Sequence, residues 1–317
     1  MLLKSADDKS KRVHLLQDLQ QSLQLDARQR EWLKEELDRL RKGIAGEREA
    51  AHYLDSFLAD GKNTVLMHDL RFEVDGQVAQ IDHMWITRDS TFVLFETKNF
   101  SGNLRINELG EFSVMYGTRE YGIPSPFEQS RRHAKVLQKL LDKLEIKSRV
   151  GTQMEYRHIV LVDPKATITR PPAKAFDTSM VIKADQFPEW RKRFIDEDVG
   201  VLDALKTLSN IRSAETIKAW GEKLIRQHRP AHLLKLPDFM QPKSPRTTAP
   251  VDQRTHNNRG PSEPSSSAKS DAADLARKLI CAHCRTKISF PEGKFCWNNE
   301  KRFGGLQYCR EHQDLFR

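Results

Sequence analysis

Apolar residues recur at helical spacing at the start of the chain. Leu16, Leu19 and Leu23 form one set, and a second set runs from Leu33 to Ile44, with Asp26 placed to cap its helix. Residues three and four apart lie on one face of a helix, so the spacing predicts amphipathic helices over residues 1–42. We expect these helices either to pack on the neighbouring domain or to self-associate.

Residues 43–236 alternate between β-rich runs and longer helical patterns. Strands are predicted near 64–67, 78–86, 91–98, 112–116 and 156–162, and helices near 44–58, 127–144, 186–195 and 211–228. Strands mixed with helices of this length favour an α/β or α+β domain over a β-sandwich. We predict the α/β class, with a mixed sheet flanked by helices.

The composition changes at Pro237. Residues 237–274 hold six of the 14 prolines among Ser, Thr, Asn and Gly. Such a segment cannot bury enough apolar surface to offset its ordering entropy, so it is predicted to be a disordered linker. Residues 275–317 then form a separate module with nine Lys and Arg against four Asp and Glu, in a chain of net charge +9. This basic excess indicates a polyanionic partner, or else it aids solubility alone.

The cysteines narrow the class of protein. All four, Cys281, Cys284, Cys296 and Cys309, fall in the last 37 residues. A disulfide scaffold would spread its cysteines through the folding unit, so this crowding indicates one local metal site in a reducing compartment. No apolar run approaches the ~18 residues of a membrane span, and the first residues lack the apolar core of a secretory signal. We therefore expect a soluble, cytoplasmic protein with no membrane partner.

Two of the strands predicted between residues 43 and 236 carry charged residues at positions expected to be buried. One contains Asp82, and the next ends in Glu96-Thr97-Lys98. Side chains at i and i+2 share a face of a strand, so Glu96 and Lys98 project together, and a turn at 88–90 lets Asp82 approach them. Two carboxylates suit Mg²⁺ (or Mn²⁺), and a lysine suits the negative charge of a phosphodiester transition state. The pattern indicates metal-dependent phosphodiester hydrolysis, although a structural ion pair at a strand end would look the same.

Four ordered segments of the body, at 43–50, 81–83, 95–102 and 126–134, resemble a known family. Together they are similar to the nuclease-related domain (NERD) family, which is similar in turn to the PD-(D/E)xK nuclease superfamily. The resemblance spans roughly residues 43–145 and implies a restriction-endonuclease-like core within 43–236. It also implies the catalytic residues Glu47, Asp82, Glu96, Lys98 and Gln129, with Asp82 and Glu96 as the ligands of Mg²⁺ or Mn²⁺.

The helix that follows Gln129 carries a basic stripe. Arg131, Lys135 and Lys139 recur every four residues and are expected on one face. Beside a nuclease site, such a stripe would bind the phosphate backbone without reading its sequence. An ordinary solvated helix face would have the same pattern.

The C-terminal module contains two half-sites for a metal. Two residues separate Cys281 from Cys284, and two separate Cys309 from His312, with 24 residues between the half-sites. Three thiolates and one imidazole make a tetrahedral zinc site. Cys296 could replace His312 as the fourth ligand, but it follows Phe295 in what looks like a packed strand, so His312 is favoured.

These patterns lead to one leading interpretation and one alternative. The leading one is a metal-dependent nuclease acting on nucleic acid, with DNA as the expected partner and a basic zinc tail that aids binding. The alternative is an inactive adaptor that uses the nuclease fold and the zinc tail only to bind nucleic acid.

Overall fold

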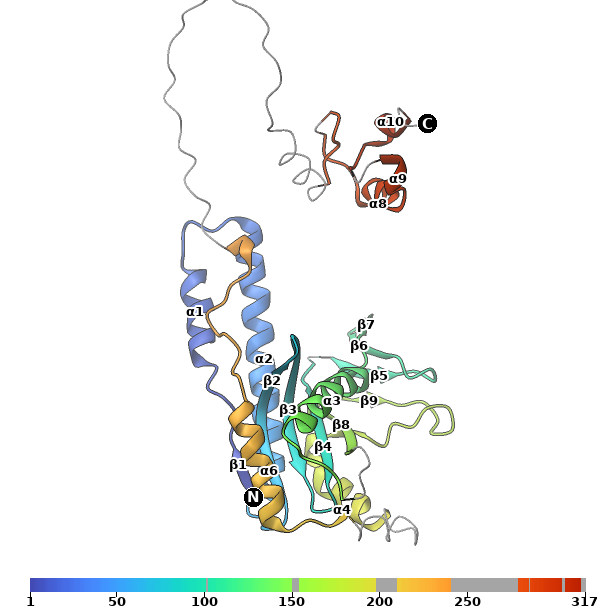
Figure 1. Ribbon diagram of the computed structural model, residues 1–317. Coiled ribbons are helices and arrows are strands. Elements are labelled where there is room, and N and C mark those ends of the chain that lie inside the picture. The colour runs from blue at the N-terminus through green and yellow to red at the C-terminus, as the bar shows by residue number, and fades with distance from the viewer. Residues whose placement is uncertain are drawn as a thin grey trace, which may run out of the picture. The chain divides into compact units, whose positions relative to one another are not determined.

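Figure 1 shows the computed structural model of the chain. The structure describes residues 1–100, 102–149, 154–197, 210–240, 279–284, 286–303 and 306–314. The chain divides into two compact units, Met1–Lys243 (the body) and Ser244–Arg317 (the C-terminal module). Within the described ranges, no helix is long and apolar enough to cross a membrane.

The body contains every strand and helix predicted between residues 43 and 236, together with several short strands. In chain order its elements are β1 (Leu2–Lys4), α1 (Ser10–Gln20), α2 (Ala27–Leu58), β2 (Val65–Val74), β3 (Gln77–Ile86), β4 (Thr91–Lys98), β5 (Asn103–Ile106), β6 (Phe112–Tyr116), β7 (Arg119–Ile123), α3 (Pro126–Lys143), β8 (Glu155–Val162), β9 (Ile168–Thr169), β10 (Val181–Lys183), η1 (Ala184–Gln186), α4 (Phe187–Glu197), α6 (Ala214–Gln227) and η2 (Asp238–Met240). The fold is therefore mixed α/β.

A six-stranded mixed sheet forms the centre of the body. Its order is β1-β2-β3-β4-β8-β10, in which β2, β3 and β4 are antiparallel neighbours and β4, β8 and β10 are parallel. Alternate residues of β4 enter two cores: Phe92 and Leu94 pack with α3 and α6, whereas Val93 and Phe95 pack with α2. The sheet thus lies between α2 on one face and α3 with α6 on the other (Figure 1).

Most of a second, four-stranded sheet lies between β4 and α3 in the sequence. Its order is β7-β6-β5-β9. Three of its strands, β5, β6 and β7, lie in the sequence between the end of β4 and the start of α3. The chain therefore leaves the central sheet at Lys98, builds this sheet, and returns at Pro126 to begin α3.

The N-terminal region differs from the prediction of a separate segment 1–42. Helix α2 runs without a break across residues 42 and 43, and β1 pairs with β2 in the central sheet. Asp26 caps α2, because its carboxylate accepts a hydrogen bond from the backbone of Gln29 in a capping box. Residues 1–42 are thus part of the body.

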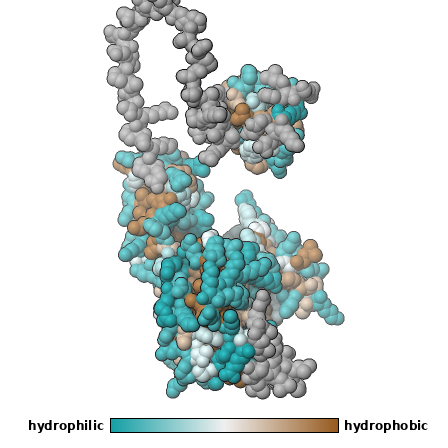
Figure 2. All heavy atoms as spheres, viewed as in Figure 1, coloured by the Kyte–Doolittle hydropathy of each residue, from teal (hydrophilic) through white to brown (hydrophobic). Residues whose placement is uncertain are grey.

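The predicted leucine stripes pack within the chain. Leu16 from α1 and Leu33 and Leu37 from α2 form one core with Met240, and Figure 2 shows hydrophobic side chains gathered where α1 and α2 lie. These leucines pack mainly on one another and on Met240, a residue that the prediction placed in the linker, and not on the predicted domain as a whole. Self-association stays a prediction, for which Leu23, 93% exposed, is the remaining candidate.

The predicted linker begins later than Pro237. Phe239 stacks edge-on against Trp32 of α2 at 5.5 Å between ring centroids, and its carbonyl accepts a hydrogen bond of 2.7 Å from Gln29. Residues 237–240 therefore belong to the body, because aromatic contact outweighs the local proline bias. Residues 241–274, the rest of the predicted linker, lie outside the described residues.

Helix α3 is joined to the central sheet by a polar contact as well as by its apolar face. The hydroxyl of Ser130 lies 2.8 Å from Nδ1 of His158 on β8. Burial, with the positive charge of Arg131 nearby, lowers the pKa of His158 to about 4. The ring is therefore neutral in the folded protein over a pH range in which it becomes protonated in the unfolded chain.

This difference in pKa predicts an acid-dependent loss of stability. Between the unfolded value of about 6.5 and the folded value of about 4, the unfolded chain binds more protons, so the free energy of unfolding falls as the pH falls. In urea titrations at pH 7 and pH 4.5, we expect the parent to lose about 2 kcal/mol more than His158→Gln. His52→Gln, a change at an exposed histidine of α2, should lose as much as the parent. Equal losses for His158→Gln and the parent would contradict the prediction.

Candidate functional site

In β2 and in β3, the alternation of residues that face the core with α3 and α6 shifts by one position, at the same level of the sheet. In β2 the core residues are odd-numbered up to Met67 and even-numbered from Leu70; in β3 they are odd-numbered up to Ile81 and even-numbered from Met84. Asp69 marks the change with φ of 51°, a left-handed conformation that Asp adopts more readily than most side chains. Asp69 and Asp82 thus sit where the alternation of the two strands breaks.

Asp82 lies where the pairing of β3 with β4 ends. The last paired residues are His83 and Phe95. Beyond them the carboxylate of Asp82 accepts a hydrogen bond of 2.7 Å from the backbone N–H of Thr97, which takes the place of a ladder bond. Burial, together with the negative charges of Glu96 and Glu47, holds the pKa of Asp82 well above its usual range.

Glu96 and Lys98 share one face of β4, as predicted. Nζ of Lys98 donates hydrogen bonds to Oε1 of Glu96 at 2.8 Å and to Oε1 of Gln129 on α3 at 3.1 Å. Glu96 is only 4% exposed. Burial raises the pKa of Glu96, and Glu47 adds to the effect, while Lys98 opposes it. The ion pair therefore stands at the buried end of a strand, held from the side by α3.

Glu47 reaches the same region from α2. A Cβ placed on Gly46 would lie 2.5 Å from Cβ of Asn99, so glycine is required for α2 to pass this close to the end of β4. Burial raises the pKa of Glu47, although Lys9, whose Nζ lies 2.6 Å from Oε2 of Glu47, opposes the effect. The five residues expected from the family resemblance, Glu47, Asp82, Glu96, Lys98 and Gln129, thus come from α2, β3, β4 and α3 and meet at the end of β4.

Histidines on both sides of β4 add to the site. Nδ1 of His133, one turn after Gln129, lies 3.9 Å from Oε2 of Glu96. Burial, with Arg132 and Lys98 nearby, lowers the pKa of His133 to about 4, so it faces Glu96 as a neutral ring. The sequence offered a signal here, because His133 lies four residues after Gln129 and therefore on the same face of α3.

A directed chain of hydrogen bonds runs on the other face of β4. His68 lies 2.9 Å from Asp55 through Nε2 and 2.7 Å from Nδ1 of His83 through Nδ1, and Nε2 of His83 lies 3.1 Å from the hydroxyl of Thr97. Burial lowers the pKa of both rings, so each carries one proton. Since a carboxylate can only accept, His68 donates to Asp55, His83 donates to His68, and Thr97 donates to His83. This chain fixes Thr97, the residue whose backbone N–H binds Asp82.

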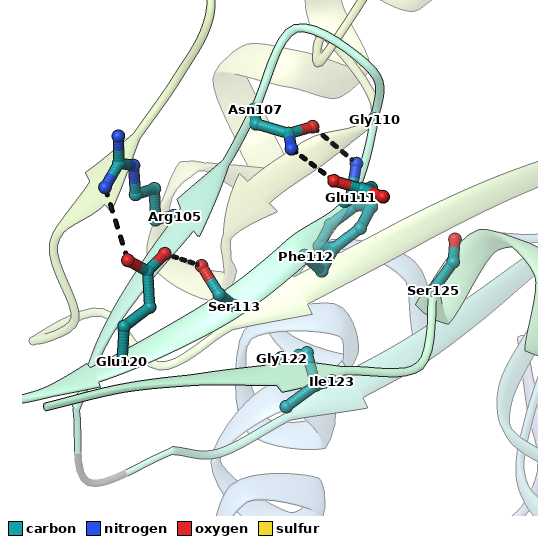
Figure 3. A pocket seen from close by; sticks show the side chains of 10 residues that line it. All are labelled: Arg105, Asn107, Gly110, Glu111, Phe112, Ser113, Glu120, Gly122, Ile123 and Ser125. Atoms are coloured by element: carbon teal, nitrogen blue, oxygen red, sulfur yellow. Dashed lines mark hydrogen bonds and ion pairs between the residues drawn. The ribbon is translucent and has the colours of Figure 1, made fainter.

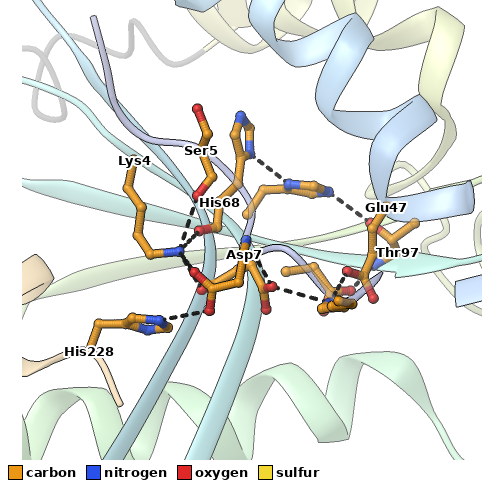
Figure 4. A network of polar contacts seen from close by, with 11 residues as sticks. Lys4, Ser5, Asp7, Glu47, His68, Thr97 and His228 are labelled. Carbon is orange, nitrogen blue, oxygen red and sulfur yellow. Dashed lines mark hydrogen bonds and ion pairs between the residues drawn. The ribbon is translucent and has the colours of Figure 1, made fainter. Parts of the chain in front are cut away.

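Two charged residues of the site were not predicted from sequence motifs. Lys9 lies before α1, far outside the family-like motifs, and Asp69 lies on β2, where no pattern marked it. Nζ of Lys9 is 2.6 Å from Glu47 and 3.2 Å from Oδ2 of Asp69. Figure 4 shows this network, in which Glu47, Asp7 and His68 approach from different elements. Only the fold brings Lys9 and Asp69 to the site.

The carboxylates fit a hard divalent cation in chemistry. Asp82 and Glu96 offer oxygen ligands, and a bound cation would offset the burial and the repulsion from neighbouring carboxylates that raise their pKa values. Among the described residues, the group of three or more potential metal ligands lies in the C-terminal module, and Glu47, Asp82 and Glu96 do not form a second one. A cation in the body would therefore rest on a pair of carboxylates, with water and substrate completing its shell.

The basic stripe of α3 faces solvent. Arg131, Lys135 and Lys139 are all exposed, while Leu137 and Leu141 on the opposite face are buried. Arg131 pairs with Glu128, and Lys139 donates a hydrogen bond of 2.8 Å to Gln77 on β3. The stripe is thus a continuous surface next to the helix residues Gln129 and His133.

A cavity of about 700 Å³ lies away from these residues, beside β5, β6 and β7 (Figure 3). Its polar side chains largely satisfy one another: Glu120 accepts hydrogen bonds from Arg105 and Ser113, and Asn107 donates to Glu111. None of the carboxylates at the end of β4 lines it. We therefore place the candidate chemistry at the end of β4.

The C-terminal module brings together the four residues predicted as zinc ligands. Ligand atoms of Cys281, Cys284, Cys309 and His312 all lie within 4.8 Å of one another. Sγ of Cys309 is 2.9 Å from Nδ1 of His312, and hydrogen bonds with Thr286 lower the pKa of Cys284 to about 6, which favours the thiolate that a metal requires. This Cys₃His group could bind zinc, whose preferred ligands and tetrahedral geometry it matches.

Cys296 is packed in the core of the module and lies outside the group of four ligands, as favoured from the sequence, but its secondary structure differs from the prediction. It lies in the helix α8 (Phe290–Asn298), not in a strand, and its side chain is fully buried. Its sulfur accepts a hydrogen bond of 3.3 Å from the backbone N–H of Tyr308, and it packs with Ile288 and Phe303 in the module's core. The remaining helices, α9 (Glu300–Phe303) and α10 (Arg310–Gln313), are single turns, and α10 carries His312.

Substitutions at the two candidate fourth ligands should separate these roles. We expect elemental analysis to find about one zinc per chain in the parent and in Cys296→Ala, because Cys296 contributes only packing. Cys281→Ser and His312→Gln should lower the zinc content to near zero, since a three-ligand remnant binds weakly. Loss of zinc in Cys296→Ala with retention in His312→Gln would reverse the assignment.

Comparison with known proteins gives one match. Residues 42–162 match the NERD family, described as "nuclease-related domain". The matched range begins in the middle of α2, before Glu47, and ends with β8, so it contains all five residues expected at the end of β4 and excludes Lys9. No curated protein and no solved structure was found to match the chain. The body of this protein thus carries a nuclease-related domain of the NERD family.

Proposed function

We propose that the body is a metal-dependent nuclease that hydrolyses phosphodiester bonds, with DNA as its substrate. The observation that carries the proposal is the convergence of an acidic group with a fixed lysine: Glu47, Asp82 and Glu96 surround the end of β4, where Lys98 is held by Glu96 and Gln129. The sheet β2-β3-β4-β8, with α2 and α3 on its two faces, supports a restriction-endonuclease-like core. The family match supports a nuclease-related function.

Each group has a distinct role in the proposed reaction. Asp82 and Glu96 would hold the Mg²⁺ or Mn²⁺ ion, which when bound supplies Lewis-acid polarisation of the phosphoryl oxygen and a more acidic water. Lys98 places its ammonium where negative charge grows on the phosphate, and its contacts with Glu96 and Gln129 remove the need to reorganise during the reaction. Glu47, paired with Lys9, would border the ion from the helix side and add negative charge near it.

The orientation of Asp82 depends on its backbone contact. The hydrogen bond from Thr97 N–H holds one oxygen of Asp82, and the histidine chain holds Thr97 from the far face of the sheet. Neutral His133 borders the second oxygen of Glu96 without adding charge. These contacts leave few alternative positions for either carboxylate.

Binding and cleavage would be divided between surfaces. The exposed stripe Arg131, Lys135 and Lys139 lies on the helix that carries Gln129, so a phosphate backbone bound there would pass the end of β4. The zinc-binding module, with its basic excess, would raise the local concentration of nucleic acid through its tether. The module therefore contributes affinity, and the body contributes chemistry.

Substitution at the end of β4 should remove hydrolysis while leaving the fold intact. With plasmid and single-stranded DNA in Mg²⁺ or Mn²⁺, we expect Asp82→Asn and Glu96→Gln to abolish cleavage because the cation loses its ligands. Lys98→Met should lower the rate ~10²–10³-fold, the usual cost of losing one preorganised charge in a transition state. EDTA should inhibit the parent.

Two results would count against this assignment. A parent that cleaves equally well in EDTA, or a Lys98→Met variant of full activity, would exclude the proposed chemistry. A parent that binds DNA but cleaves neither DNA nor RNA would favour the inactive adaptor. Lys143→Met is a matched control, since Lys143 pairs with Asp75 on the exposed surface at 2.6 Å and is expected to leave cleavage unchanged.

Removal of the C-terminal module should weaken DNA binding more than it slows the chemistry. Truncation after Lys243 keeps Phe239 and Met240 in the body. We expect weaker affinity and a shallower dependence of log K on log salt, because each lost phosphate contact reduces the slope by about one. Cleavage at saturating enzyme should persist. An unchanged affinity and salt slope, measured by fluorescence anisotropy, would contradict a binding role for the module.

A further inference from the structure

The segment between β1 and α1, residues 5–9 (the N-terminal arm), places one lysine among the carboxylates of the body. Nζ of Lys9 lies 2.6 Å from Oε2 of Glu47 and 3.2 Å from Oδ2 of Asp69, and its side chain is only 16% exposed. Burial by itself would lower the pKa of Lys9, but the charges of Glu47 and Asp69 raise it by more than burial lowers it. The side chain therefore stays in the ammonium form. Lys9 is thus a permanent positive charge inside the site.

The arm is fixed in place from both sides. Nζ of Lys4 donates hydrogen bonds of 3.0 Å to the carbonyls of His68 and Asp69, the two residues at the bend of β2. The backbone N–H of Asp7 donates to Oδ2 of Asp69 at 3.3 Å, and the carboxylate of Asp7 lies 2.9 Å from Nε2 of His228, which follows α6 (Figure 4). These contacts hold the arm at Asp7 and at the preceding Lys4, and so fix the position of Lys9 next to the carboxylates.

The carboxylates around the end of β4 differ in the cations that they contact. Four of them, Glu47, Asp69, Asp82 and Glu96, lie around the ammonium groups of Lys9 and Lys98, and the charge of Arg132 also acts on Glu96. Lys9 neutralises the Glu47–Asp69 side, and Lys98 neutralises the Glu96 side. Asp82, between them, accepts a hydrogen bond from a backbone N–H and forms no ion pair with the described residues; burial and its acidic neighbours raise its pKa, which the charge of Lys98 opposes.

We propose that Lys9 is a positioning residue that acts as a built-in counter-ion, occupying the Glu47–Asp69 side of the cluster and so limiting the site to one divalent cation at Asp82 and Glu96. The inference rests on the proposed function, since it assumes that those two carboxylates bind the cation. It adds a residue from outside the nuclease-related domain to the site, because residue 9 lies before the matched range of 42–162.

The charge model has a consequence that a purely structural lysine would not share. Lys9→Met keeps the length of the side chain but leaves an additional uncompensated negative charge, so Mn²⁺ should bind at least about tenfold more tightly. Lys9→Arg keeps the charge and should bind Mn²⁺ as the parent does. In the double variant Lys9→Met with Asp69→Asn, the lost positive charge is matched by a lost negative charge, so the affinity should return to that of the parent.

The experiment is a titration of the full-length, zinc-loaded chain with Mn²⁺, followed by electron paramagnetic resonance of the free ion. The Asp82→Asn/Glu96→Gln variant identifies the ion that belongs to the body. Circular dichroism of each variant shows that the fold is retained. The double variant also guards against misfolding, because damage to the arm would be greater in it than in Lys9→Met alone.

The outcomes separate the two proposals. If the parent binds one Mn²⁺ that the Asp82→Asn/Glu96→Gln change removes, and Lys9→Met tightens it with reversal in the double variant, Lys9 is the counter-ion. If the parent binds that ion but Lys9→Met binds it equally or more weakly, the inference on Lys9 is overturned and the proposed metal site stands. If the parent binds no Mn²⁺ that this change removes, the proposed function fails and the inference on Lys9 fails with it.

Discussion

The structure of the body depends on how it accommodates several like charges at the buried end of one strand. Asp82 and Glu96 lie within reach of each other's charge, with Glu47 close by, and burial raises the pKa of all three. Carboxylates in such a place are costly unless opposite charges and hydrogen bonds compensate them. Lys98, Lys9 and the backbone N–H of Thr97 supply much of that compensation.

This requirement explains features that would otherwise look unrelated. The left-handed residue at Asp69 bends β2 so that a carboxylate meets Lys9, and the glycine at position 46 lets α2 approach the end of β4. His68 and His83 hold the side chain of Thr97 through a chain of hydrogen bonds, and the backbone N–H of Thr97 in turn holds the carboxylate of Asp82. Strain and buried polar groups of this kind persist where surrounding contacts over-determine them, as at sites of binding and catalysis.

Much of the local structure followed from periodicity, because strands β2, β3, β4 and β8 and helix α3 have strong apolar patterns that their tertiary surroundings reinforce. The contact of Glu96 with Lys98 was also predictable, since spacing within one strand determines it. The roles of Lys9 and Asp69 were not, because they depend on β1 joining the sheet and on a bend in β2, both long-range effects. The linker boundary failed for a similar reason: Phe239 packs on Trp32, about 200 residues away in the sequence.

The placement of Lys9 makes the charge around the end of β4 depend on a segment outside the nuclease-related domain. A domain that matches a nuclease-related family over residues 42–162 contains the acids and Lys98, but its charge is set in part by an arm outside that range. The N-terminal arm connects β1 of the central sheet to α1, and the pairing of β1 and the contacts of Lys4 and Asp7 hold it in place. The position of Lys9 therefore depends on the packing of the N-terminal helices. Changes in the packing of α1 and α2 would therefore alter the charge beside Glu47 and Asp69 without replacing any of the carboxylates. The group of charges around the end of β4 therefore extends beyond residues 42–162 and includes Lys9 of the N-terminal arm.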